Sequence, residues 1–287
     1  MKESFLFGGS LIVVGLILQC SVGPVVWETF TWPVNIIVLL AFLSLIVLSY
    51  LVRKKVYAVR YLSSYQAAIP ALVYVVVLTT MMGLIRQKVD GSWLSSMLTF
   101  WPFVLIYVYV ALILGFVILR RLGRMRNHVS IHDISFLLNH LGLFVAMTTA
   151  TLGNADMQRV KMMTVIGEPE WRAFTQEGMI QEMPLTIELK KFMMETYDDG
   201  SPKRFASEIS IQTKKGKSVQ ATIDVNKPVE VEGWKIYQYS YDTQMGAKSN
   251  MSVLELVSDP WLPYVYIGIY MMLAGAVCMF VIGGKKQ

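Results

Sequence analysis

The sequence predicts an α-helical membrane protein with six transmembrane helices and a β-rich extracytoplasmic domain between helices five and six. Of the 287 residues, 54% are hydrophobic and only 16% are charged, and the mean hydropathy is +0.49. A soluble domain usually has about 25% charged residues. Six apolar runs come close to the roughly 20 residues that a helix needs to cross a bilayer.

The six runs are separated by polar or basic segments. In chain order they are Phe5–Val22, Val34–Val52, Ala67–Ile85, Phe100–Leu119, Ile134–Leu152 and Trp261–Ile282. Backbone groups in hydrocarbon must be paired within the segment, and no run alternates like a barrel strand, so we expect helices. We expect the first run to stay as a helix rather than be removed as a signal, because Gln19 stands where a processing site needs a small residue.

Basic residues in the short loops predict the orientation. Eleven lysines and arginines fall on one side of the expected membrane, and only Arg86 and Lys88 fall in a short loop on the other. Cytoplasmic loops carry the excess of positive charge. This bias places both termini in the cytoplasm and residues 153–260 in the periplasm, for a multi-pass protein of the inner (cytoplasmic) membrane.

The apolar runs and the distribution of charged residues divide the chain into four parts. Residues 1–133 form a four-helix membrane region with basic cytoplasmic loops, 134–152 a histidine-bearing helix, 153–260 the periplasmic domain, and 261–287 the last helix and tail. The periplasmic part has sixteen acids against thirteen bases. A nucleic-acid-binding protein would concentrate positive charge on its folded polar domain, so no nucleic-acid partner is expected.

Period-two alternation predicts strands in residues 153–260. Apolar residues alternate with polar ones through 185–189, 209–211, 219–225 and 251–257. In the segment Trp234–Tyr241, strict alternation would place Tyr237, Tyr239 and Tyr241 on one face. The part contains no histidine and no cysteine, which favours a structural or docking sheet over a hydrolytic domain.

All three histidines lie within thirteen positions, at His128, His132 and His140. His140 falls about 9 Å inside the fifth run, where an ionisable residue is costly and usually faces a bundle interior or a ligand. A neutral imidazole is a good axial ligand for haem iron. The residue alone leaves two interpretations open, a haem ligand or a histidine that packs between helices.

His128 and His132 lie at the cytoplasmic boundary beside several arginines. They are four residues apart, so they predict either a weak haem-entry site, with arginines for the propionates, or an ordinary interfacial helix start; the second interpretation is favoured.

The order of motifs from His140 onward is similar to the ResB (CcsB) family of cytochrome c biogenesis proteins. The residues that carry the resemblance are His140–Phe144, Thr151–Gly153, Gly167-Glu168, Pro184–Leu189, Phe192–Tyr197, Asp199–Glu208, Val225–Pro228, Gly233–Tyr241 and Asp259-Pro260. The resemblance covers roughly residues 134–282. That family has three helices before its outer domain, whereas this chain has five, and the role of the first two is not implied.

The resemblance implies a subunit of the system II cytochrome c synthase, which carries haem across the membrane and delivers it to apocytochrome c outside. It implies that His140 is an axial ligand to a transiently held haem b. It also implies a CcsA-type, tryptophan-rich membrane protein as partner, and a non-catalytic or co-catalytic role in the haem lyase complex. Apocytochrome c and membrane lipid are the other expected partners.

Two other classes of function stay open. A b-haem anchor of a respiratory complex is disfavoured, because such anchors need two or more pairs of buried histidines. A structural or sensory membrane protein with an external partner-binding domain would use His140 only for packing.

Overall fold

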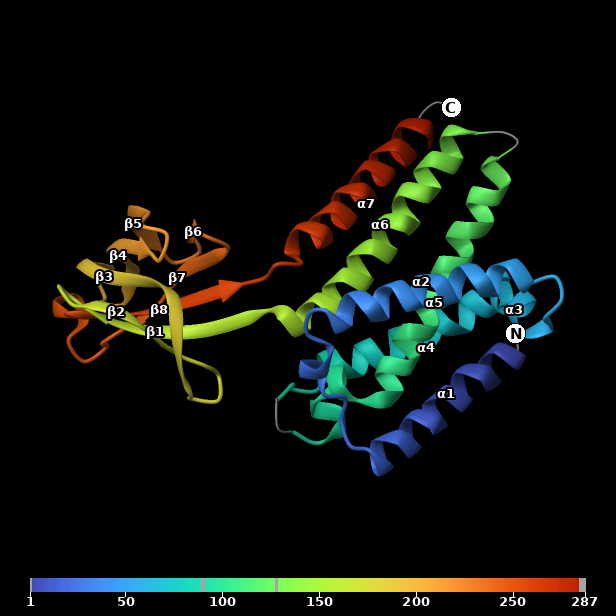
Figure 1. Cartoon of the computed structure of the whole chain (residues 1–287), viewed down its shortest axis with the longest axis horizontal. Helices are drawn as coiled ribbons and strands as arrows, with labels where there is room; N and C mark the ends of the chain where they lie inside the picture. The colour runs from blue at the N-terminus through green and yellow to red at the C-terminus, as the bar shows by residue number, and fades with distance from the viewer. Residues whose placement is uncertain (1, 89–90, 127–128, 284–287) are drawn as a thin grey trace. The chain divides into compact units, whose positions relative to one another are not determined.

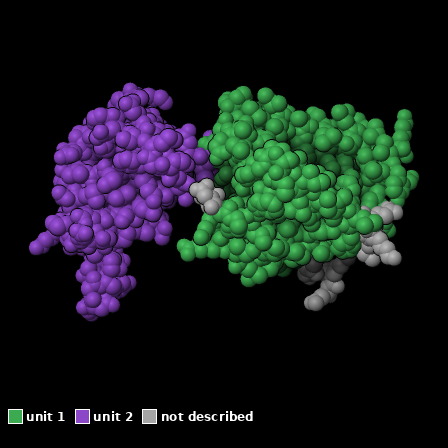
Figure 2. Space-filling view, turned by 90° about the horizontal axis from the view of Figure 1, so that it is seen from below, with its two compact units in different colours: residues 1–156, 261–287 green, residues 157–260 purple. Residues whose placement is uncertain are grey.

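The computed structural model describes residues 2–88, 91–126 and 129–283. The chain divides into two compact units (Figure 2), unit 1 with Met1–Asp156 and Trp261–Gln287, and unit 2 with Met157–Pro260. Unit 1 is helical and unit 2 is a sheet (Figure 1).

Unit 1 contains the apolar helices. They are α1 (Lys2–Ser21), α2 (Val34–Val52), α3 (Tyr57–Leu62), α4 (Tyr65–Leu84), α5 (Trp101–Met125), α6 (Ile131–Gly153) and α7 (Leu262–Gly283). Short 3-10 turns lie at η1 (Trp27–Phe30), η2 (Trp93–Ser95), η3 (Met97–Thr99) and η4 (Asn154–Asp156). The short helix α3, in the loop after α2, was not predicted.

Five described helices are long and apolar enough to cross a membrane. The segments are Val34–Val52, Gln66–Leu84, Trp101–Met125, Ile131–Asp156 and Leu262–Val281. The apolar part of α1, Phe5–Ser21, is shorter. The prediction of several spanning helices is therefore confirmed, and the first of the six spans stays a prediction.

Helix α5 is at the centre of the bundle. It contacts α1, α2, α4 and α6, and half of its most apolar window is buried. Its residues Ile106 and Ile113 pack into a cluster with Ala67 and Ala71 of α4, and Phe116 joins a second cluster with α2 and α6. The fourth predicted run, Phe100–Leu119, therefore forms the central helix, which is surrounded by the other helices.

Helices α6 and α7 lie side by side (Figure 1) and approach closely through glycines. A Cβ added at Gly142 would lie 2.6 Å from the carbonyl oxygen of Gly268. Nearer the start of α6, the hydroxyl of Ser135 donates to the carbonyl of Gly275 at 2.9 Å. Small residues let membrane helices pack backbone to backbone. The glycines and the serine of α6 and α7 therefore allow the close approach of these two helices.

Unit 2 is one eight-stranded antiparallel sheet in the order β5-β4-β3-β2-β1-β8-β7-β6. The strands are β1 (Gln158–Val165), β2 (Pro169–Phe174), β3 (Ile180–Thr196), β4 (Pro202–Thr213), β5 (Ser218–Asp224), β6 (Val229–Val231), β7 (Trp234–Tyr241) and β8 (Met251–Ser258). Contacts of β5 with β6 and β7 bring the two ends of the sheet together around one apolar core. The β-rich domain is therefore confirmed as a curled, barrel-like sheet.

A bulge in β7 overturns one prediction about the tyrosines. Tyr237 lies opposite Glu255, but the register shifts between Gln238 and Ser240, so that Tyr241 lies opposite the buried Ser252. An extra residue reverses the alternation of faces beyond it. Tyr241 thus packs against other aromatic rings of unit 2, whereas Tyr239 is exposed.

Candidate functional site

The N-terminus of α6 is capped by its own sequence. The Ser130 hydroxyl accepts from the backbone N–H of His132, and the Asp133 carboxylate accepts from the backbone N–H of Ser130 at 3.0 Å. A reciprocal cap satisfies otherwise unpaired N–H groups, and a carboxylate in the first turn suits the helix dipole. The cap starts α6 at Ile131 and so sets where His140 falls along the helix.

His140 is partly buried in the middle of α6. Its Nδ1 lies 2.8 Å from the carbonyl oxygen of Phe136, one turn earlier. Because a carbonyl only accepts, the neutral imidazole carries its proton on Nδ1 and leaves the lone pair on Nε2. Metal-binding histidines commonly have one ring nitrogen tied to a carbonyl in this way. The residue therefore fits an iron ligand that presents Nε2.

The orientation of the imidazole is supported by an aromatic ring. The rings of His140 and Phe136 are stacked, with centroids 3.8 Å apart and an interplanar angle of 17°. The guanidinium carbon of Arg121, from α5, lies 4.6 Å from the centroid of the same phenylalanine ring. Stacking and cation–π contact both restrict the rotamer of Phe136, and through it that of His140.

Arg121 is itself held by the helix cap. Its Nε lies 2.6 Å from Oδ1 of Asp133, as an ion pair whose N–H is not aligned as a hydrogen bond. The two side chains are 20% and 11% exposed. The contact links α5 to the start of α6, so that Asp133, Arg121 and Phe136 form one series of contacts that ends at His140.

The other two predicted histidines do not join this series through their side chains. His132 is exposed, and only its backbone carbonyl contacts Arg121, at 3.4 Å. His128 lies outside the described residues. Among the residues that the structure describes, no group of three or more histidine, cysteine, aspartate or glutamate side chains is placed to hold a metal ion. A second axial ligand to iron at His140 is therefore not apparent in the described part of the chain.

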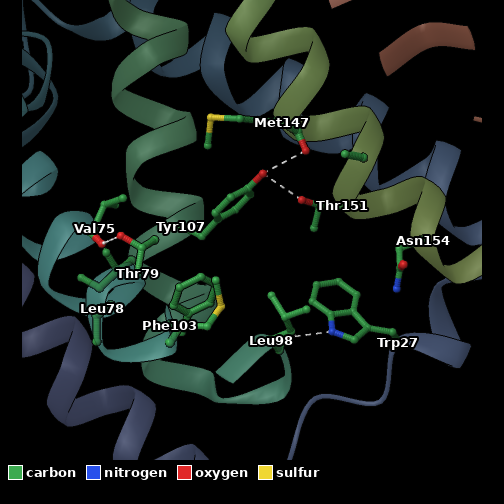
Figure 3. Close-up of a pocket in the computed structure, with 13 residues that line it drawn as sticks. Trp27, Val75, Leu78, Thr79, Leu98, Phe103, Tyr107, Met147, Thr151 and Asn154 are labelled. Atoms are coloured by element: carbon green, nitrogen blue, oxygen red, sulfur yellow. Dashed lines mark hydrogen bonds between the residues drawn. The ribbon is translucent and has the colours of Figure 1, made fainter. Parts of the chain in front are cut away.

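A cavity of about 420 Å³ lies over α5 between α4 and α6; we call it the intramembrane cavity (Figure 3). Its walls include Leu78 and Met82 of α4, Phe103 and Ile106 of α5, and Met147 and Ala150 of α6. Four of its lining residues are exposed, among them Thr79 of α4 and Ala150 of α6. The cavity therefore opens at the surface of the bundle between α4 and α6.

Polar atoms in this cavity come from α5 and α6. The Tyr107 hydroxyl donates to the carbonyl of Met147 at 3.0 Å and accepts from the Thr151 hydroxyl at 2.9 Å (Figure 3). The indole Nε1 of Trp27 donates to the carbonyl of Leu98 at 3.0 Å, which ties η1 to η3 beside the cavity.

A second cavity of about 610 Å³, the outer cavity, adjoins the first. The two share Trp27, Met82, Leu98 and Asn154 as lining residues. The outer cavity is also lined by polar residues of the loop after α4, among them Gln87, Lys88 and Ser96. Gln87 braces this loop, since its side-chain oxygen accepts from the N–H of Met97 and its nitrogen donates to backbone carbonyls.

Unit 2 shows ion pairs rather than a catalytic cluster. Arg204 of β4 contacts Asp224 of β5 through Nε at 2.7 Å and a second nitrogen at 2.9 Å, and it also contacts Glu195 at 3.1 Å. The Arg204 guanidinium holds the pKa of Asp224 below its ordinary value. Trp234, in contrast, is 8% exposed and belongs to the core, as the predicted aromatic strand allows.

Sequence reasoning identified His140 but missed the residues that orient it. Ser130 and Asp133 have the spacing of a cap, which was a usable signal. Phe136, one turn before His140, was another. The contribution of Arg121 had no such signal, because it depends on how α5 packs against α6.

Part of this chain matches a known protein family. Residues 119–251 match the ResB-like family. Two curated relatives, each named cytochrome c biogenesis protein CcsB, come from Prochlorococcus marinus strains NATL1A and NATL2A. Each is 28% identical over 102 residues, which is 36% of this chain and 23% of the relative. The match thus spans about a quarter of the length of these relatives.

Among solved structures, a chain titled cytochrome c haem lyase CcmF is aligned over 75% of this chain and 34% of its own length. The sequence identity is 12% and the TM-score is 0.36, which is too low to indicate a shared fold. The family match, by contrast, includes all of α6, with His140, and most of unit 2. The resemblance to ResB proteins that the motifs indicated is thereby confirmed, and residues 119–251 of this chain are a ResB-like segment.

Proposed function

We propose that this chain is a membrane subunit of a system II cytochrome c synthase, which holds haem within the membrane and passes it to apocytochrome c outside. The observation that carries the proposal is the state of His140. It lies inside the apolar helix of a ResB-like segment, its Nδ1 is tied to the Phe136 carbonyl, and Nε2 is left for iron. The names of the curated relatives support the same process.

Haem would be cargo, held transiently as haem b and shared with a partner. Iron in such sites commonly takes two axial ligands, and among the described residues of α6 His140 is the partly buried histidine, whereas His132 in the first turn is exposed. We therefore propose that a CcsA-type, tryptophan-rich membrane protein supplies the second ligand. His140 would position the haem, and covalent attachment would fall to the assembled complex, so this subunit is non-catalytic or co-catalytic.

The proposed direction of transfer requires unit 2 on the outer side of the inner membrane, with both termini in the cytoplasm. Reporter fusions test this arrangement. Fusions after Arg60 and Arg126 should be active only as cytoplasmic reporters, and a fusion near Gly200 should be active only as a periplasmic reporter. A periplasmic reporter that is active after Arg126 would overturn the six-span topology.

Substitution of the histidine tests the ligand role. In the complex purified with its partner, His140→Ala should abolish the haem absorbance bands, because the nitrogen ligand is lost. Added imidazole should restore the bands and part of cytochrome c maturation, because it fits the space left by the side chain. His132→Ala is the matched control and should keep its haem, since His132 is exposed.

The same experiment separates the other classes of function. Haem that is retained by the chain without any partner would favour a respiratory b-haem anchor. Normal haem content in the His140→Ala complex would contradict the ligand role, and absence of haem from both chain and complex would favour a structural or sensory protein.

A further inference from the structure

We propose that the intramembrane cavity and the outer cavity together form a second binding site for a planar, amphipathic, carboxylate-bearing ring molecule. Haem is the member of this class that the proposed function supplies, so the inference rests on that function. The site is separate from His140 and would receive haem as it moves toward the end of α6 that leads into unit 2.

The two cavities differ in the residues at their edges. Both are walled mainly by apolar surface, and the outer cavity adds polar side chains of the loop after α4, among them Gln87 and Lys88. Four shared lining residues make them neighbours. Apolar surface is stabilised by burial, and a charged group needs a partner of opposite charge. The two cavities together therefore suit a molecule with an apolar body and an anionic edge.

Lys88 supplies the positive charge for that edge. Together with Arg86 it departs from the positive-inside bias of the other eleven basic loop residues, and orientation alone does not account for it. A role in binding an anionic group would account for Lys88, because this residue lines the outer cavity. A lysine at the mouth of an apolar cavity attracts a carboxylate without a fixed hydrogen-bond geometry.

The size of the apolar part favours a ring system over a lipid chain. The α4 wall extends from Val75 to Met82, seven residues or about 10 Å of helix. The hydrocarbon of one leaflet is about 15 Å deep, so an acyl chain would extend beyond this wall. The cavity also presents the rings of Trp27, Phe103 and Tyr107, and flat apolar ligands stack on aromatic side chains.

The α6 wall connects this site to His140. Met147 follows His140 by seven residues, which is two helical turns, about 10 Å along the axis and about 20° in direction. The helix face that presents His140 therefore continues into the cavity at Met147 and Thr151. A ring molecule released from His140 toward that end of α6 would reach the cavity along a single helix face.

Metal-free protoporphyrin IX is the probe that isolates the second site. It has the ring and both carboxylates of haem but no iron, so ligation by His140 contributes nothing to its binding. The full chain in phosphatidylcholine nanodiscs should bind it saturably, above the level of empty nanodiscs. Wild type and His140→Ala should bind equally, as measured from porphyrin emission.

Matched substitutions on α4 test the location. Thr79 lines the intramembrane cavity, and Val77, which lies two residues earlier and is also exposed, does not. Thr79→Trp should weaken protoporphyrin binding by about tenfold or more, because the indole fills the cavity, whereas Val77→Trp should leave it unchanged. Ala150→Leu, on the facing α6 wall, is a second blocking variant that should weaken binding if Thr79→Trp does not fold.

The proposed contact between Lys88 and the ligand carboxylates is tested by removing the charge of either partner. Lys88→Gln should weaken protoporphyrin binding by about fivefold, the upper range for a solvent-accessible ion pair, and Arg86→Gln should not. Protoporphyrin dimethyl ester, which has no carboxylates, should bind wild type and Lys88→Gln alike.

Three results would overturn the site. The first is protoporphyrin binding no stronger than that of empty nanodiscs, and the second is equal binding by the Thr79→Trp, Ala150→Leu and Val77→Trp variants. The third is a phospholipid that stays bound to wild type in native mass spectrometry and is released by Thr79→Trp. Failure of the proposed function is distinguishable, because it appears as haem absorbance that is absent from the wild-type complex or unaffected by His140→Ala.

Discussion

The Oδ2 of Asp156 lies 2.7 Å from the indole Nε1 of Trp261, which joins the end of α6 to the residue before α7. The same oxygen accepts from Nδ2 of Asn35 at 2.7 Å, and Oδ1 accepts from the backbone N–H of Trp32, also at 2.7 Å. One carboxylate therefore fixes the start of α2 against both helices that flank unit 2 in the chain. This contact attaches an N-terminal helix to the ResB-like helix α6.

Removal of that carboxylate should loosen the junction. Asp156→Ala removes the closer of the two acceptors of the buried Asn35 amide and leaves only the carbonyl of Leu152, at 3.3 Å, and a hydrogen bond to a charged group contributes about 1.5–3 kcal/mol. We expect a lower Tm for the purified chain, and a smaller loss for Trp261→Phe, which removes one donor only. Equal Tm values for wild type and Asp156→Ala would show that water or lipid head groups replace the carboxylate.

Phe136 should control the orientation of the His140 imidazole rather than its presence. Phe136→Leu removes the stacked ring and the surface beneath Arg121, a contact of about 0.5–1.5 kcal/mol. We expect the haem complex to keep its iron ligand but to show a broadened electron paramagnetic resonance signal, because the imidazole plane is less restricted.

The conservative variant Phe136→Tyr retains the aromatic ring and should restore the sharp signal. A sharp signal from Phe136→Leu would mean that the hydrogen bond to the residue 136 carbonyl orients the imidazole alone.

The close contact of α6 and α7 should be intolerant of added side chain. Gly142→Leu directs its side chain at the backbone of α7 near Gly268, and overpacking of this kind costs about 1–3 kcal/mol. We expect a lower Tm for the purified chain. Gly83→Leu in α4 is the control, because a Cβ there meets no atom within 4 Å. A similar Tm for both variants would show that α7 moves aside without cost.

Unit 2 should lose stability in acid through Asp224. The folded state depresses the pKa of this carboxyl below its ordinary value of 3.8, chiefly through the hydrogen bonds from Arg204. A depressed pKa gives stability that is complete above the ordinary pKa and is lost as the pH falls below it. Unfolding of β structure, followed by circular dichroism between pH 6 and pH 2, should show this loss for wild type and less of it for Asp224→Asn.

A double-mutant cycle with Arg204→Gln checks the cause. Arg204→Gln and the double variant should both lose less stability in acid than wild type does, as Asp224→Asn does, because each removes the hydrogen bonds between Arg204 and Asp224. If Asp224→Asn keeps the full acid dependence, the other carboxylates of unit 2 are responsible.

Several features of the protein could be predicted because they depend on local pattern. Apolar runs of membrane length identified α2, α4, α5, α6 and α7, and alternation identified most strands of unit 2. His140 stood out because an ionisable residue within an apolar helix is costly wherever the helix packs. The family resemblance also depended on linear order alone, since its motifs follow one another along the chain.

Other features depended on which segments meet in space. The bulge in β7 turns Tyr241 to the opposite face from Tyr237, and a one-residue shift in register leaves no reliable trace in composition. Arg121 contacts Phe136 and Asp133 only because α5 packs against the first turns of α6. The cavity between α4 and α6 is lined by residues of three helices and three 3-10 turns.

By itself, therefore, the sequence determined most of the helices and strands and singled out His140 in an apolar run, because length, period and desolvation cost act on each segment separately. Only the tertiary structure decided which nitrogen of His140 is free, which residues hold the imidazole, and that Lys88 borders a cavity. The contact of His140 with Phe136 is local but depends on the rotamer of each side chain, whereas the contact with Arg121 and the border of the cavity join residues far apart in the chain, whose distances are set by packing.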